Sequence, residues 1–213
     1  MQDISQSRKD YTLKELNESD LQSNPIMQFR FWLDEVMKSN SMTEPNAMTL
    51  STVSSEGKPS SRIVLLKHIA DNGFDFFTNY NSKKGKQLVQ NKHACLLFFW
   101  PTLERQVRIE GKVEKISSTE SDEYFNARPF ESQVGAWASP QSDVIPNKNT
   151  LKDWYKEFED IFESKEITRP AHWGGFRLIP EVIEFWQGRP NRLHDRIEYI
   201  VNGDEWTMRR LAP

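Results

Sequence analysis

Cysteine is nearly absent from this sequence of 213 residues, where it occurs once, as Cys95. A single cysteine excludes a disulfide within the chain, and its place in the apolar run ACLLFFW predicts a buried core thiol. Long apolar runs are missing too: no stretch approaches the ~20 apolar residues of a membrane span, and the segment MQDISQSRKDYTLKEL has no signal-peptide core. We therefore expect a soluble, cytoplasmic protein without membrane association, in a reducing compartment.

Positive charge is not in excess either, because the formal net charge is -3. A protein that neutralises many phosphates usually carries a basic field, so broad nucleic-acid binding is disfavoured. The sequence also has no Walker loop, no G-x-G-x-x-G and no nucleophile elbow, which disfavours nucleotide hydrolysis, a dinucleotide-binding Rossmann domain and α/β-hydrolase chemistry. His68, His93 and His172 lack the spacing of metal ligands, so no metal site is expected.

What the sequence does contain is a series of short β-like runs separated by turn signals. The runs are AMTLSTVS, SRIVLLKH, GFDFFTN, ACLLFFW, RQVRIEGKVEKI, GGFRLI, EVIEFWQ, RIEYIV and EWTMRRL, the last two joined at Asn202-Gly203. They predict a mostly β fold with flanking helices and an antiparallel barrel. We expect residues 1–23, which are polar and aperiodic, to be a mobile arm, and residues 24–213 to form a single domain.

Helical patterns flank these runs. Asn24 can cap a helix that begins at Pro25 and should pack on a sheet, with apolar residues at helical spacing: Ile26, Phe29, Leu33 and Val36. A further helical stretch is predicted from Thr119 to about Ala138. Another, LKDWYKEFEDIFESK, has a stripe interpreted as core packing: Leu151, Trp154, Tyr155, Phe158, Ile161 and Phe162.

Basic residues gather at two places in the first half of the chain. Arg62 and Lys67 lie at the two ends of the run SRIVLLKH. A regular strand would send them to opposite faces, so unless a bulge intervenes they would bind two anionic groups and not one; exposed strand ends are the alternative. Ser82 can cap a short helix whose first turn holds Lys83 and Lys84, although cations are disfavoured there. A bound phosphate would relieve that conflict, and a solvated basic turn is the alternative.

Two further groups of polar residues follow. Tyr124, Arg128 and Ser132 would share a helical face suited to a phosphate monoester, if the helix continues through Pro129; an exposed polar face is the alternative. In IEFWQGRPNRLHDRIEYI, the alternating residues Arg192, His194 and Arg196 would project to one side of a strand, beside Trp186 as a flat wall or as ordinary core. Two arginines and a histidine rarely fill a core face, which favours a functional role.

These segments resemble a known family. IEFWQGRPNRLHDR resembles the C-terminal signature of pyridoxamine (pyridoxine) 5'-phosphate oxidases, and RIVLLK resembles their first flavin-contacting strand. The resemblance continues through SKKGK, TLERQVRIEGKVEK, YFNARPFESQVGAWAS and RRLAP, and so covers nearly the whole chain from about Arg8. It implies an FMN-binding split β-barrel that forms a homodimer, with two active sites built at the subunit interface from both chains.

The activity implied is FMN-dependent oxidation of pyridoxamine 5'-phosphate and pyridoxine 5'-phosphate by O2 to pyridoxal 5'-phosphate, with release of H2O2, a step of vitamin B6 salvage and cofactor biosynthesis. By position in the matching motifs, FMN contacts are implied for Arg62, Ile63, Val64, Leu65, Leu66, Lys67, Phe77, Thr78, Lys83, Lys84, Gln106, Gln141, Ser142, Trp186 and Arg196.

The resemblance also implies a substrate site. Lys67, Tyr124, Arg128 and Ser132 would hold the substrate phosphate, whereas Arg192 and His194 would lie over the pyridine ring as catalytic candidates. The segment RKDY, made of Arg8, Lys9, Asp10 and Tyr11, resembles an arm that covers the substrate.

The chain departs from the family's pattern at one point, because Lys83-Lys84 stands where Arg-Lys is common, and a bidentate guanidinium contact to phosphate is replaced by a point charge. Two alternative functions stay open. One is a split-barrel flavin reductase or related FMN oxidoreductase, since the fold hosts several activities. The other is a non-catalytic binder of FMN or pyridoxal phosphate.

Overall fold

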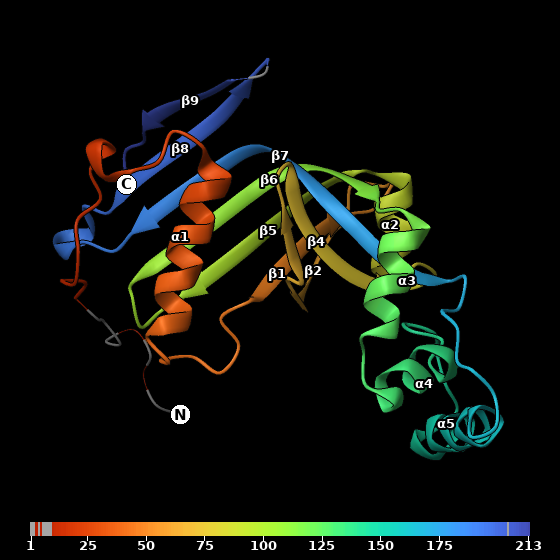
Figure 1. The fold of residues 1–213 in the computed structure, drawn as a ribbon. Coiled ribbons are helices and arrows are strands. Elements are labelled where there is room, and N and C mark those ends of the chain that lie inside the picture. The colour runs from red at the N-terminus through yellow and green to blue at the C-terminus, as the bar shows by residue number, and fades with distance from the viewer. Residues whose placement is uncertain (1–2, 4, 6–9, 204) are drawn as a thin grey trace. The chain divides into compact units, whose positions relative to one another are not determined.

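The computed structural model describes residues 3, 5, 10–203 and 205–213. Its elements follow the chain in this order: η2 (Glu18–Asp20), α1 (Pro25–Lys38), β1 (Ala47–Val53), β2 (Pro59–Leu65), β3 (His68–Ala70), β4 (Gly73–Asn79), α2 (Lys83–Gln90), β5 (His93–Trp100), β6 (Arg105–Lys115), α3 (Ser118–Asn126), α4 (Phe130–Ala138), α5 (Lys148–Phe162), β7 (Trp173–Gln187), η3 (Pro190–Arg192), β8 (Asp195–Asn202) and β9 (Glu205–Arg210). Figure 1 shows these helices and strands along the chain.

The described strands form one nine-stranded sheet. Its order is β2-β1-β5-β6-β7-β4-β3, and β8 pairs with β7 and β9. The pairs β3/β4, β4/β7, β7/β8 and β8/β9 are antiparallel. Two predicted strands, GGFRLI and EVIEFWQ, are one continuous strand, β7. Pro180 falls between the stretch paired with β4 and the stretch paired with β8, so its missing N–H interrupts neither of these two ladders.

The chain divides into two compact units, which are described separately. Unit 1 consists of Met1–Leu50, Cys95–Gly111 and Pro180–Pro213. Its helix α1 begins as predicted, with the Asn24 side chain accepting hydrogen bonds from the amides of the first turn. The buried face of α1 packs on strands: Phe29 contacts Phe98 with ring centroids 4.8 Å apart, and Trp32 contacts Phe185 at 5.1 Å. The prediction that this helix packs on a sheet is confirmed.

Residues 10–23 also pack within unit 1. Leu16 is buried, Gln22 accepts a hydrogen bond from the Tyr199 hydroxyl at 2.7 Å, and Arg210 forms a bidentate ion pair with Glu18. This segment therefore has defined contacts here, and its mobility remains a prediction from the sequence.

Unit 2 consists of Ser51–Ala94 and Lys112–Ile179. Its helix α2 begins as predicted, with the Ser82 side chain accepting the Gly85 amide. The predicted helix from Thr119 to Ala138 is wrong as one piece: it is broken into α3 and α4 at Ala127–Pro129. Pro129 lacks an amide hydrogen and disfavours the helical conformation of the residue before it, so the chain turns there.

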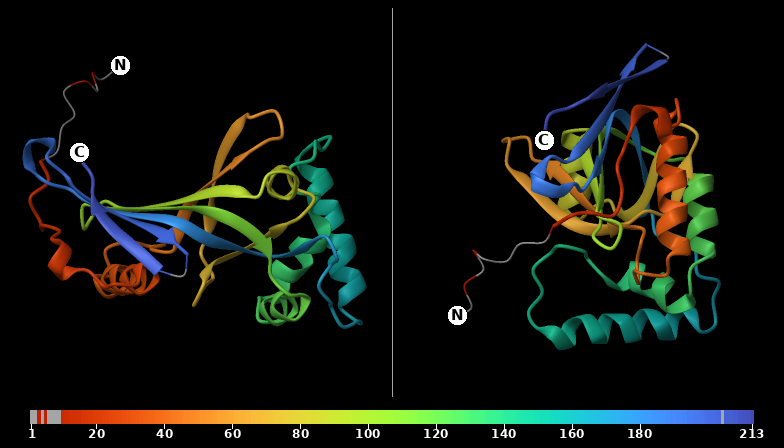
Figure 2. Two further views of the ribbon diagram at one scale, coloured as in Figure 1. Left: turned by 90° about the horizontal axis from the view of Figure 1, so that it is seen from above. Right: turned by 90° about the vertical axis from the view of Figure 1, so that its left-hand side faces the viewer.

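Helices α4 and α5 lie side by side in unit 2 (Figure 2). The apolar stripe of α5 contains no buried residue, so its interpretation as core packing is wrong. Trp137 of α4 covers part of it, with ring centroids 5.9 Å from Phe158 and 5.6 Å from Phe162. The stripe is therefore half-covered by a neighbouring helix and half open.

Cys95 was predicted to be a buried core thiol, and that is wrong as well. Along β5 the buried side chains are Ala94, Leu96, Phe98 and Trp100, so the alternation of the strand turns Cys95 to the other face, where it is half-buried. Burial still raises the pKa of its thiol to about 11, so the thiol is protonated at neutral pH.

Candidate active site

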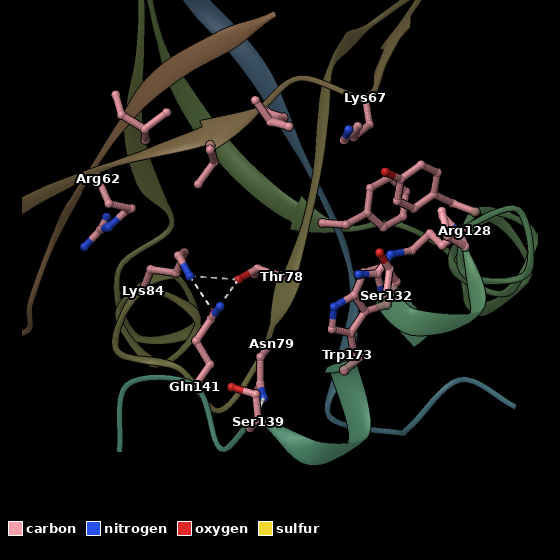
Figure 3. Close-up of a pocket in the computed structure, with 17 residues that line it drawn as sticks. Arg62, Lys67, Thr78, Asn79, Lys84, Arg128, Ser132, Ser139, Gln141 and Trp173 are labelled. Carbon is pink, nitrogen blue, oxygen red and sulfur yellow. Dashed lines mark hydrogen bonds between the residues drawn. The ribbon is translucent and has the colours of Figure 1, made fainter. Parts of the chain in front are cut away.

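Unit 2 contains a pocket of about 510 Å³, drawn in Figure 3. Side chains from β2, β4, α2, α3, α4 and the loop after α4 converge on it. The lining residues are Arg62, Ile63, Val64, Leu65, Lys67, Phe77, Thr78, Asn79, Lys84, Tyr124, Arg128, Pro129, Ser132, Ala136, Ser139, Gln141 and Trp173. Four of them are cationic, and among the described lining residues there is no carboxylate. A pocket with this charge is suited to an anionic ligand.

One side of the pocket is built from α2 and the neighbouring strands. The Lys84 ammonium donates to the Thr78 hydroxyl at 3.0 Å and to the Gln141 side-chain oxygen at 2.7 Å, as Figure 3 shows. The Arg62 guanidinium donates to the hydroxyls of Thr52 at 2.6 Å and Ser60 at 2.7 Å. Because these acceptors are neutral, neither positive charge is compensated by them, and burial together with Arg62 lowers the pKa of Lys84 to about 8.

The opposite side holds Arg128, whose guanidinium carbon lies 4.5 Å from the centre of the Trp173 ring. Its NH1 nitrogen is buried and has no hydrogen-bond partner among the described residues. Burial lowers the pKa of this guanidinium. A buried N–H donor without a partner costs free energy, and an anionic ligand that accepted a hydrogen bond from it would remove that cost.

Three aromatic rings form a wall of the same pocket. Phe77 and Tyr124 are stacked with centroids 3.9 Å apart, and Phe77 and Trp173 are stacked at 5.6 Å. Trp173 also packs on buried Phe125 and Ala136. The pocket thus combines cations with flat apolar surface, the combination that a phosphorylated aromatic molecule requires.

Most site residues expected from the sequence of unit 2 come together here, but three of them do not line the pocket. Leu66 is buried, Lys83 is exposed, and Ser142 is exposed with a left-handed backbone at φ 78°. The expectation that Arg62 and Lys67 lie on opposite faces is wrong, since β2 ends at Leu65 and Lys67 falls in the link before β3, outside the alternation. Both reach one pocket.

The break at Pro129 does not separate the three polar residues predicted to share a helical face. Tyr124 belongs to α3, Arg128 to the link and Ser132 to the first turn of α4, and all line the pocket. The sequence pattern missed five lining residues: Asn79, Pro129, Ala136, Ser139 and Trp173. A usable signal existed for Trp173, because the Gly174-Gly175 pair after it marks a close approach of neighbouring groups: a Cβ at Gly174 would overlap the Tyr80 hydroxyl.

The remaining predicted cofactor residues belong to unit 1. Gln106, Trp186 and Arg196 line a pocket of about 350 Å³ together with Arg108, Glu184 and Pro213. Arg196 is held by the buried Glu184 carboxylate, to which its Nε donates at 2.7 Å and its NH2 at 3.1 Å. Its planar fork is therefore fixed in orientation.

Arg192 and His194 do not alternate along a strand with Arg196, so that prediction is wrong. Arg192 ends the 3₁₀ turn η3 with a left-handed backbone at φ 62°, and β8 begins only at Asp195. Arg192 is exposed, whereas His194 is half-buried. Its ring centroid lies 4.7 Å from that of Trp186 and 5.7 Å from that of Tyr11.

The His194 Nδ1 accepts the backbone N–H of Arg189 at 3.1 Å, which leaves Nε2 as the protonated nitrogen of the neutral ring. Burial, reinforced by Arg192, lowers the pKa of His194, so the ring is neutral at physiological pH. Of the arm residues predicted to contact substrate, Arg8 and Lys9 lie outside the described residues, Asp10 is exposed, and Tyr11 packs on Trp186 and His194.

Within the described part of the chain, no group of three or more His, Cys, Asp or Glu residues could hold a metal ion. No helix in that part is long and apolar enough to cross a membrane.

The fold and the unit 2 pocket define a mostly β protein whose candidate ligand site is lined by cationic side chains and stacked aromatic rings. Residues 34–162 match the family profile described as pyridoxamine 5'-phosphate oxidase, and residues 173–213 match the profile described as pyridoxine 5'-phosphate oxidase C-terminal dimerisation region. The chain belongs to the pyridoxamine 5'-phosphate oxidase family of enzymes. The second match supports homodimer formation.

Relatives that match the chain over its full length support the same family. The chain is 53% identical over 213 residues to a pyridoxine/pyridoxamine 5'-phosphate oxidase of Polynucleobacter asymbioticus, with 100% of each chain covered. It is 52% identical over 213 residues to the protein of that name from Gloeothece citriformis, covering 100% of this chain and 99% of the relative.

Solved structures confirm the split-barrel fold expected from the sequence. PhzG from Burkholderia lata, in complex with tetrahydrophenazine-1-carboxylic acid, superposes with a TM-score of 0.88 at 30% identity, covering 94% of this chain and 99% of PhzG. A pyridoxamine 5'-phosphate oxidase-related, FMN binding protein from Nostoc punctiforme superposes with a TM-score of 0.69 at 18% identity, covering 87% and 97%. At that identity the second likeness concerns the fold alone.

Proposed function

We propose that this protein oxidises pyridoxamine 5'-phosphate and pyridoxine 5'-phosphate to pyridoxal 5'-phosphate with bound FMN, using O2 and releasing H2O2. The observation that carries the proposal is the carboxylate-free lining of the unit 2 pocket, with a buried Arg128 nitrogen that has no partner among the described residues. Its anion-binding character, the aromatic wall and membership of the family all favour a phosphorylated ring as the ligand.

The residues present fit FMN. Arg62 and Lys84 would hold its phosphate, with Thr78 and Gln141 already bound to Lys84, and Lys83 adding an exposed charge nearby. Lys67, Phe77 and the β2 residues Ile63, Val64, Leu65 and Leu66 would contact the remainder, with Ser142 beside Gln141. When bound, FMN supplies a two-electron acceptor that O2 can reoxidise.

A second group would grip the substrate phosphate. Arg128 offers a guanidinium fork whose NH1 is buried, Lys67 a point charge, and Tyr124 and Ser132 hydroxyl donors. Because this phosphate takes no part in the oxidation, its binding energy serves to orient the ring and its reacting carbon.

The other predicted residues belong to the C-terminal dimerisation region or to the arm. We propose that a second copy of the chain contributes Gln106, Trp186 and Arg196 to the FMN site and Arg192 and His194 to the ring of the substrate, so that each active site is built from both chains. Neutral His194 would donate a hydrogen bond from Nε2–H to the substrate ring, or take up a proton at Nδ1 once the Arg189 N–H releases that nitrogen, while Arg192 orients the ring. Tyr11, packed on His194, would cover the substrate together with Arg8, Lys9 and Asp10.

A second candidate is oxidation of a different ring substrate, because PhzG, bound to a tetrahydrophenazine carboxylic acid, is similar over 94% of this chain. A flavin reductase and a non-catalytic binder of FMN or pyridoxal phosphate are further alternatives. Arg128, Lys67, Tyr124 and Ser132 favour a phosphorylated substrate over a carboxylic acid, since a phosphate monoester offers more acceptor oxygens for these donors.

The test is aerobic turnover of pyridoxamine 5'-phosphate by FMN-loaded protein, with H2O2 and the product aldehyde measured together and unphosphorylated pyridoxamine as the matched control. Equal amounts of both products, with the control turned over poorly, are expected. Bound flavin without turnover, or equal turnover of the control, would reject the proposed substrate.

A further inference from the structure

Outside the pocket, a row of charged residues crosses three neighbouring strands of unit 2. Asp75 of β4 lies opposite His68 of β3 and opposite Arg177 of β7. The Asp75 carboxylate is buried and accepts two hydrogen bonds from Arg177, at 2.7 and 2.8 Å, while its Oδ2 lies 3.0 Å from the His68 Nδ1. The backbone of the same residue accepts the Lys67 N–H at 2.9 Å. Asp75 thus fixes the link that carries Lys67 into the pocket.

Arg177 reaches a second element from the other end of this row. Its NH2 donates to the Glu120 Oε1 at 3.1 Å. The other oxygen of Glu120 accepts the Ser117 N–H at 3.0 Å and completes the capping box of α3. The Glu120 carboxylate therefore caps the N-terminus of α3 and also connects its first turn to β7 through the hydrogen bond from Arg177.

Helix α3 carries Tyr124 one turn after Glu120, on the same face of the helix. Tyr124 stacks on Phe77, which lies two residues after Asp75 and on the same side of β4. The chain then leads directly to Arg128 and Ser132. Two separate segments that line the pocket, one with Lys67 and one with Tyr124 and Arg128, are thus joined through Arg177.

We propose that Arg177, with Asp75 and Glu120, is a positioning residue that sets the spacing between Lys67 and the Tyr124–Arg128 segment, and thereby selects a phosphate group on the substrate. The inference rests on the proposed function and deepens it. Arg177 is not among the residues lining the pocket, so it acts through the two segments that it joins. A lysine could not replace it, because only the guanidinium fork pairs with both Asp75 oxygens and still reaches Glu120.

The test compares Glu120→Gln and Arg177→Lys, each FMN-loaded, with a matched control, Glu159→Gln. Glu159 is also a glutamate of a unit 2 helix and pairs with Lys156 on the surface of α5, away from the row. We expect the KM for pyridoxamine 5'-phosphate to rise about threefold or more in Glu120→Gln and about tenfold or more in Arg177→Lys, because a small misplacement of binding groups is costly. The kcat should stay near the wild-type value, and the Kd for FMN, whose phosphate Arg62 and Lys84 would hold, should change by much less than the KM.

A double variant distinguishes a positioning role of Arg177 from simple structural support. In a protein that already carries Arg128→Met, the effect of Arg177→Lys on KM should largely vanish, because Arg177 would act through the contact between Arg128 and the substrate phosphate. Unchanged KM in both variants, additive effects on that background, or a parallel loss of FMN binding would overturn the proposal. If Arg177→Lys does not fold, Glu120→Gln alone decides by the same criteria.

Failure of the proposed function is distinguishable from failure of this inference. If wild-type protein does not turn over the substrate, the function is wrong; the Kd for pyridoxal 5'-phosphate, measured by calorimetry against unphosphorylated pyridoxal, then replaces KM. A preference for the phosphorylated compound that is lost in Glu120→Gln but kept in Glu159→Gln still supports the positioning role, and a wild type without that preference overturns it.

Discussion

Replacing Arg128 by methionine should separate stability from binding. Arg128 carries a buried NH1 without a partner among the described residues, and it lies over Trp173. The unpaired donor costs about 1–3 kcal/mol. The cation–π contact with Trp173 stabilises the folded protein by about 1–2 kcal/mol. Methionine removes both terms while its thioether still packs on the tryptophan ring, so the free energy of unfolding should change by less than about 1 kcal/mol, in either direction.

Binding should respond very differently. A hydrogen bond from a charged donor is worth about 1.5–3 kcal/mol. Since about 1.4 kcal/mol corresponds to a factor of ten, loss of the contact should raise the KM for pyridoxamine 5'-phosphate by about 10- to 150-fold. The kcat should fall less than kcat/KM, because the phosphate lies away from the reacting carbon.

Two assays check this prediction on Arg128→Met: urea unfolding of FMN-free protein and steady-state kinetics of FMN-loaded protein. Lys156→Met is the control, since it removes the same charge from the exposed face of α5 in the same unit. A loss of more than about 2 kcal/mol in unfolding free energy, combined with an unchanged KM, would mean that Arg128 supports the fold and would refute its binding role.

Three further predictions concern other parts of the site. Because the pKa of Lys84 is lowered to about 8, its positive charge is lost above that pH, and the Kd for FMN should rise there. The free energy of unfolding of the FMN-free protein should instead increase between pH 8 and the ordinary lysine pKa of 10.5, because the unfolded chain binds more protons than the folded one in that range. Lys84→Met should remove both trends, and Lys83→Met should remove neither. His194→Asn should lower kcat/KM at unchanged FMN affinity, and wild-type kinetics would remove it from the site. Gly175→Ala should destabilise by about 1–3 kcal/mol in thermal unfolding, since its Cβ would overlap Ile116 and lie 2.9 Å from Phe77; wild-type stability would show that the neighbours can yield.

The local elements and the family follow from the sequence alone. Asn24 and Ser82 cap helices as predicted because a capping side chain satisfies amides within its own first turn. Strands such as β4 and β5 lie where the apolar runs place them. Motifs matched over nearly the whole chain were specific enough to indicate the oxidase family, which the comparisons confirm.

Other features depend on packing that periodicity cannot report. A periodicity argument assumes an unbroken element. It therefore placed Arg192 and His194 on a strand, although both precede β8. It also predicted that the side chains of Arg62 and Lys67 lie on opposite faces of one strand, although β2 ends before Lys67. It likewise assigned the apolar stripe of α5 to a core, because the pattern shows that a helix has an apolar face and not whether another element covers it.

The decisive property of the pocket is also tertiary. The Arg128 NH1 has no partner among the described residues because α3, α4 and Trp173 surround it without bringing a carboxylate, and nothing in the sequence pattern indicates that. The joining of Lys67 to α3 through Arg177 depends on the strand register between β4 and β7, in which Asp75 pairs with a residue 102 positions further along the chain. Such contacts arise only when distant segments pack, since local propensity carries no information about which partner a charged side chain will meet.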